Sequence, residues 1–156
     1  MDIDILVEKG LGIKPLTREW LKKVVVTVLT AEHTSPSIQV SLLITDQDKV
    51  HTLNRKYLDE DRPTDVLSFP MLASDSSPPT FVAPPDNIIH LGEVIISYPQ
   101  AVIQAEEHRH SVRKEMAILT IHGILHLLGY DHDVPEAESK MKAREMNILK
   151  MMENLQ

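Results

Sequence analysis

Three histidines lie within the eleven-residue run HGILHLLGYDH, namely His122, His126 and His132. The first two are four residues apart in an apolar stretch typical of a helix. Four residues turn a helix by about 400°, so both rings leave one face, about 6 Å apart along the axis. That separation lets both imidazoles reach one metal ion at about 2.0–2.1 Å. The spacing therefore predicts a shared metal ion on this helix.

The third histidine follows a glycine. Gly129 is the residue type that most often ends a helix in the left-handed conformation, so we expect the chain to turn there and bring His132 to the same ion. Three neutral imidazoles and one open position are typical of a catalytic zinc site. Zinc is favoured, although imidazole also suits other divalent transition metals. Two histidines at this spacing can be core residues by coincidence, but packing does not explain the third.

The spacing matches the metzincin protease frame HExxHxxGxxH except at one position. Those proteases place a glutamate directly after the first histidine, where it acts as the general base. The corresponding residue here is Gly123. The sequence thus contains the ligand frame without the peptide-cleaving base, which indicates a zincin site adapted to other chemistry.

Three further polar residues deserve an interpretation. Asp131 precedes His132 and is a candidate to orient a ligand or relay a proton, because metal-bound imidazoles usually donate their second N–H to a carboxylate or carbonyl. Glu115 lies seven residues before His122 on the same helix face, a rise of about 10 Å, so we expect a surface carboxylate there, with a hydrogen-bond acceptor for a metal ligand as the alternative. Arg62 is a candidate phosphate ligand, because guanidinium groups grip phosphate with two hydrogen bonds. An ion pair with the acidic residues beside Arg62 is the alternative.

The composition narrows the class of protein. The net charge of −7 argues against a protein that coats nucleic acid, which needs clustered cations. A local basic groove remains compatible with it, and residues 108–114 form the one dense basic stretch, either a phosphate contact or an ordinary solvated helix entrance. Cysteine is absent, so any transition-metal site must use histidines and carboxylates. No signal region or membrane-spanning apolar run is evident, and we expect a cytoplasmic protein.

The elements that must position these residues alternate along the chain. The pattern predicts an α+β fold in a single compact domain over residues 1–156, with a small mixed β-sheet, helices packed on it and a central metal-binding helix. A helix is expected from Thr17 to about Thr30, with a strand over Val24–Leu29 as the competing interpretation. The other expected elements are strands at Asp2–Val7, Ser37–Thr45, Asp65–Phe69 and Ile88–Ile96, and helices after Asp46, Ser97, Ser111 and Asp133.

The chain resembles the YbeY family of metal-dependent endoribonucleases, the rRNA maturation factors. Three segments carry the resemblance in the family's order: Leu53–Pro70 (LNRKYLDEDRPTDVLSFP), Leu91–Ser97 (LGEVIIS) and Ile121–His132 (IHGILHLLGYDH). The resemblance implies a zincin-like fold and one zinc ion on His122, His126 and His132. It also implies cleavage of single-stranded RNA, used in 16S rRNA 3′ end maturation and in ribosome quality control, with the small subunit or its assembly factors as partners.

One residue departs from the family pattern. Members of the family have an arginine directly after the tyrosine of the first segment, whereas here Tyr57 is followed by Leu58. Either Arg62 supplies the positive charge instead, as it is the one Arg or Lys between Lys56 and Arg109, or the loop binds RNA differently. Two other functions are compatible with the sequence, a metalloprotease-like hydrolase and a noncatalytic metal-binding ribosome assembly factor.

Overall fold

The computed structural model describes residues 1–8, 10–12, 16–58, 65–71, 88–130 and 134–154. Within these ranges the elements occur in the predicted order. They are β1 (Asp2–Val7), α1 (Arg18–Ala31), β2 (Ile38–Thr45), α2 (Gln47–Leu58), β3 (Val66–Pro70), β4 (Ile89–Ser97), α3 (Tyr98–Glu107), α4 (Val112–Leu127) and α5 (Pro135–Asn154). The α+β prediction is confirmed, and Val24–Leu29 is helical.

The helices begin where capping side chains were predicted. Thr17, Ser97 and Ser111 each accept a hydrogen bond from the backbone N–H three residues further on, which satisfies a donor that the helix itself leaves unpaired. Asp46 does the same for α2, where its Oδ1 accepts from the Lys49 N–H at 2.8 Å. These short-range bonds fix the start of α1, α2, α3 and α4, whereas Asp133, expected to begin the last helix, lies outside the described residues.

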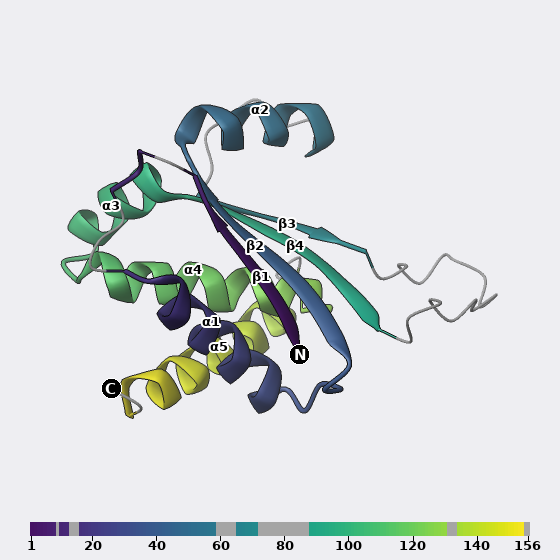
Figure 1. The fold of residues 1–156 in the computed structure, drawn as a ribbon. Helices are drawn as coiled ribbons and strands as arrows, with labels where there is room; N and C mark the ends of the chain where they lie inside the picture. Colours follow the sequence, from purple (N-terminus) through teal and green to yellow (C-terminus); the bar gives the residue numbers. More distant parts are fainter. Residues whose placement is uncertain (9, 13–15, 59–64, 72–87, 131–133, 155–156) are drawn as a thin grey trace.

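The sheet is mixed. Its four strands lie in the order β1-β2-β4-β3, with β1, β2 and β4 parallel and β3 antiparallel to β4 (Figure 1). The antiparallel strand lies at the edge, paired so that Ser68 is opposite Val94. This edge borders α4, because the Ser68 hydroxyl donates to the Gly123 carbonyl oxygen at 3.0 Å.

The two faces of the sheet bury different amounts of apolar surface. One face contributes Leu42, Ile44, Val94 and Ile96 to the main core, which also contains the buried residues of α1, α4 and α5. The opposite face contributes Leu43, Leu67 and Ile95 to a small cluster with Val50 of α2. Neighbouring strand residues thus alternate between the cores, as the pleat requires. Figure 1 shows α1, α4 and α5 gathered on one side of the sheet and α2 on the other.

Helix α4 lies inside the main core along most of its length. Among its buried residues are Met116, Ile121, Ile124 and Leu125, each with 0% of its surface exposed. The helix packs against the sheet as well as against its neighbouring helices. It is therefore the central helix that the sequence predicts. Its packing fixes the backbone from which the side chains at its ends project.

Candidate metal centre

The histidine pair lies near the C-terminal end of α4. His122 and His126 point their Nε2 atoms at each other, 3.1 Å apart, with ring centroids separated by 4.6 Å and ring planes at 79°. Two nitrogen ligands of one tetrahedral zinc ion at about 2.0–2.1 Å would be about 3.3 Å apart. The donor atoms of the pair therefore fit a shared metal ion, and the helical spacing alone brings them together.

A carboxylate from another helix sets the orientation of His122. Glu145 of α5 contacts Nδ1 of His122 through its Oε1. A carboxylate can only accept, so the proton of the neutral imidazole lies on Nδ1 and the lone pair lies on Nε2. This is the arrangement in which a carboxylate fixes the tautomer of a metal-binding histidine. Sequence reasoning missed Glu145, because α5 carries several acidic residues and nothing in their spacing separates this one.

The turn after α4 follows the glycine prediction. Gly129 has φ +103°, its N–H donates to the His126 carbonyl at 3.0 Å, and the Tyr130 N–H donates to the Leu125 carbonyl at 3.0 Å. These two bonds make the Schellman motif that commonly ends a helix. The predicted residues Asp131 and His132 come directly after this turn and lie outside the described residues.

The side chain of Tyr130 is anchored to the C-terminal end of α1. Its hydroxyl hydrogen-bonds to Glu32, which raises the pKa of Tyr130, and burial acts in the same direction. Arg144 of α5 donates from Nε to Glu32 Oε2 at 2.9 Å and forms an ion pair with the same oxygen through Nη2. Arg144 also donates to the Ala31 carbonyl at 3.2 Å. Neighbouring residues of α5 therefore hold both the ring of His122 and the chain that leads towards His132.

The packing around Gly123 explains why a glycine follows the first histidine. A Cβ atom there would lie 2.5 Å from Cγ1 and 3.2 Å from Cγ2 of Val94, and 3.3 Å from Cγ2 of Val66. Both valines are stiff β-branched side chains on the sheet. The position that holds the general base in metzincin proteases is therefore filled by strands β3 and β4.

A small pocket opens beside the pair on the α5 side. Its volume is about 180 Å³, and it is lined by His122, Glu138, Met141, Lys142 and Glu145. Lys142 forms an i,i+4 ion pair with Glu138 at 3.1 Å while 68% of its side chain stays exposed. The pocket thus has a cation at its rim, next to the imidazole of His122. Arg62, the cation predicted for phosphate binding, and its neighbours 59–64 lie outside the described residues.

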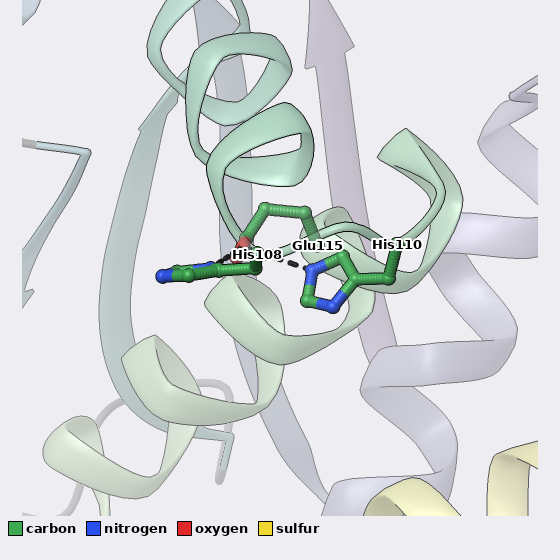
Figure 2. A group of neighbouring side chains, drawn as sticks. All are labelled: His108, His110 and Glu115. Carbon is green, nitrogen blue, oxygen red and sulfur yellow. Dashed lines mark hydrogen bonds and ion pairs between the residues drawn. The ribbon is translucent and has the colours of Figure 1, made fainter.

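At the opposite end of α4, the prediction of a surface carboxylate is wrong. Glu115 is 2% exposed and its Oε1 contacts His108 Nδ1 at 2.9 Å and His110 Nε2 at 3.1 Å (Figure 2). In the described part of the chain, these three residues form a group whose donor atoms lie within 4.8 Å of one another and could hold a metal ion. The helical rise placed Glu115 far from His122, as expected, but other histidines fold back onto it.

Several side chains of the predicted basic stretch have local partners. His108 and His110 turn towards Glu115, the Arg113 guanidinium lies 4.8 Å from the centroid of the Trp20 ring, and Lys114 Nζ lies 4.0 Å from a Glu153 carboxylate oxygen. A cation over an aromatic face is held by the charge distribution of the ring. The cations of Arg113 and Lys114 therefore have separate local partners.

Among the helices that the structure describes, none is both long enough and apolar enough to cross a membrane. The most apolar of them, α4, has 16 residues and carries charged residues in its first turns.

The chain matches known proteins over nearly its full length. The family model of endoribonuclease YbeY matches residues 7–153. An endoribonuclease YbeY of Dehalococcoides mccartyi (strain CBDB1) is 46% identical over 149 residues, covering 93% of this chain and 89% of that protein. One from Chloroflexus aurantiacus (strain ATCC 29366 / DSM 635 / J-10-fl) is 42% identical over 135 residues, covering 86% of each chain.

A solved structure shares the fold. The solution structure of TM1509 from Thermotoga maritima superposes with a TM-score of 0.63 at 28% sequence identity, covering 96% of this chain and 88% of that one. The sequence matches, the shared fold and the histidine-bearing helix agree with one another. The chain therefore belongs to the YbeY family of endoribonucleases, enzymes that hydrolyse RNA.

Proposed function

We propose that this protein is a zinc-dependent endoribonuclease specific for single-stranded RNA, which processes rRNA, matures the 16S rRNA 3′ end and takes part in ribosome quality control. The observation that carries the proposal is the pair of Nε2 atoms, 3.1 Å apart, on His122 and His126 of α4. Membership of an endoribonuclease family makes RNA the expected substrate of this site. The small ribosomal subunit or its assembly factors are the proposed partners.

In this proposal the metal is held by His122, His126 and His132. When bound there, a zinc-type ion would supply Lewis acidity at a phosphoryl oxygen and would lower the pKa of water, so that hydroxide is available as nucleophile at neutral pH. Glu145 keeps the proton of His122 on Nδ1, so that Nε2 presents its lone pair. Asp131, beside His132, is the candidate to orient that ligand or to relay a proton.

The anionic substrate needs positive charge near the histidines, because a phosphodiester loses part of its hydration on binding. Two side chains are candidates to supply it. Lys142 lines the pocket beside His122, and its exposed ammonium can approach a phosphate once it leaves Glu138. Arg62 is the candidate from the loop whose usual arginine is replaced here by Leu58.

The two competing functions make different demands on the same site. A metalloprotease needs a general base next to the first histidine, and the packing of Gly123 against Val94 leaves no room for one. A noncatalytic assembly factor would bind metal and ribosome without cleaving RNA. An activity assay therefore separates both alternatives from the proposal.

The test uses protein reconstituted with one equivalent of zinc and three substrates: a labelled single-stranded RNA, the same RNA annealed to its complement, and a labelled peptide. We expect cleavage of the single strand, little cleavage of the duplex and none of the peptide. Arg62→Ala should slow cleavage by about 10–100-fold, or about 1.4–3 kcal/mol, without loss of metal. Peptide cleavage that His122→Ala abolishes would contradict the proposal, as would metal-loaded protein that leaves every RNA intact.

A further inference from the structure

We propose that His108, His110 and Glu115 form a second site for a divalent transition metal of the zinc class. The site lies at the N-terminal end of α4, about two helical turns from His122, and is separate from the proposed catalytic centre. Figure 2 shows the two imidazoles converging on the carboxylate of Glu115 from the chain segment that joins α3 to α4.

The two distances from the Glu115 carboxylate to the imidazoles are close to those between ligands of one such ion. Glu115 Oε1 lies 2.9 Å from His108 Nδ1 and 3.1 Å from His110 Nε2. Ligands of a tetrahedral zinc ion at about 2.0–2.1 Å are about 3.3 Å apart, so each of these two oxygen–nitrogen pairs needs to separate by only a few tenths of an ångström. The three donor atoms all lie within 4.8 Å of one another.

The three residues differ in burial, and we expect different roles for them. The side chains of Glu115 and His110 are 2% and 18% exposed, so the surrounding protein fixes them. The side chain of His108 is 57% exposed, so its ring can adjust to an incoming ion and leaves a solvent-facing side for a further ligand. Two imidazoles with one carboxylate suit zinc, cobalt or nickel better than magnesium or calcium, which prefer all-oxygen ligands.

The backbone brings the two histidines to the same side. Helix α3 ends in a Schellman motif, in which the Arg109 N–H donates to the Glu106 carbonyl at 3.2 Å and the His110 N–H donates to the Ala105 carbonyl at 3.1 Å. Arg109 therefore has φ +56°, a conformation that costs a non-glycine residue about 1–2 kcal/mol. This reversal between His108 and His110 lets both rings reach Glu115 in the first turn of α4. An ion bound there would fasten α3 to α4.

The experiment uses the full chain with the first centre removed by His122→Ala and His126→Ala. Circular dichroism verifies that this double variant folds, and cobalt(II) is then titrated while the visible absorption of the ion is recorded. We expect one cobalt ion per chain in the double variant, and the stepwise addition of zinc should displace it. Zinc should also raise the thermal midpoint of the double variant in a concentration-dependent way, since a ligand that binds the folded state stabilises it.

Adding His108→Ala to the double variant should weaken cobalt binding at least about 100-fold. His108 is largely exposed, so this change leaves the core intact, and His110→Ala is the second variant. The matched control is His33→Asn, which removes an exposed imidazole outside both groups and keeps a residue that tolerates the φ of +55° at that position. No cobalt uptake by the folded double variant, or uptake that both added histidine changes leave unaltered, would overturn the second site.

Discussion

The two ends of α4 combine the same types of side chain in different ways. Each end has two imidazoles and one glutamate. At the C-terminal end, Glu145 contacts the outer nitrogen of His122, so that the imidazole Nε2 atoms face each other. At the N-terminal end, Glu115 places a single oxygen against both imidazoles. The carboxylate orients a ligand in the first group and is itself a candidate ligand in the second.

The turns beside the two groups repeat this contrast. Both α3 and α4 end in a Schellman motif, with Arg109 at the positive-φ position of one and Gly129 at that of the other. Glycine adopts this conformation without a steric penalty, whereas arginine does not. The sequence therefore predicts this backbone geometry after α4, where a glycine occupies the position, but gives no signal for it after α3, where an arginine does.

The largest expected effect concerns Gly123, which follows the first histidine of the proposed catalytic group. Gly123→Glu should destabilise the protein by about 3 kcal/mol or more, because the side chain collides with Val94 and its charge would be buried. Gly123→Ala should cost about 1–3 kcal/mol through the collision alone. Urea unfolding followed by circular dichroism measures both values. A fully stable Gly123→Glu variant would show that the base position of proteases is open here after all.

The next effect tests the orienting role of Glu145. Glu145→Gln should weaken zinc binding by about 10–100-fold, because an amide holds the His122 tautomer less firmly than a carboxylate does. The matched control is Glu138→Gln, which changes a carboxylate lining the same pocket that contacts Lys142 instead. Competition with a chelator of known affinity gives both constants. Equal zinc affinities of the two variants would contradict the orienting role of Glu145.

Two mirror-image changes test the turns. Arg109→Gly should stabilise the protein by about 0.5–1 kcal/mol, the relief of steric strain less the greater freedom of glycine in the unfolded chain. Gly129→Ala should destabilise it by about 1–2 kcal/mol through φ, since among the described residues no atom beyond its chain neighbours lies within 4 Å of the added Cβ. Thermal and urea unfolding report both signs. The account of the turns fails if both changes shift stability in the same direction.

The last effect is a pH dependence beside the proposed catalytic group. The hydrogen bond to Glu32 raises the pKa of Tyr130, so its contribution to stability is present below the unfolded pKa of about 10 and is lost as pH rises through the higher folded value. Tyr130→Phe should therefore cost about 1 kcal/mol near neutral pH. The difference between wild type and variant should shrink in alkali. A difference that stays constant across this range would exclude the hydrogen bond as its cause.

The sequence predicts features that depend on local periodicity and local capping. The helical repeat places His122 and His126 together, and Thr17 and Ser111 begin their helices as their side chains suggest. The role of Glu145 depends on how α5 packs against α4, which no spacing within either helix encodes. The burial of Glu115 depends on a chain reversal at an arginine, a residue type that gives no signal for one.

One measurement tests the central claim that the C-terminal histidine group of α4 cleaves RNA. The cleavage rate of a labelled single-stranded RNA is measured under single-turnover conditions for zinc-reconstituted wild type, His126→Ala and the control His33→Asn. We expect His126→Ala to slow cleavage at least about 100-fold and to bind less zinc, while His33→Asn cleaves at the wild-type rate. Cleavage at the wild-type rate by a folded His126→Ala variant would show that this histidine group does not cleave RNA.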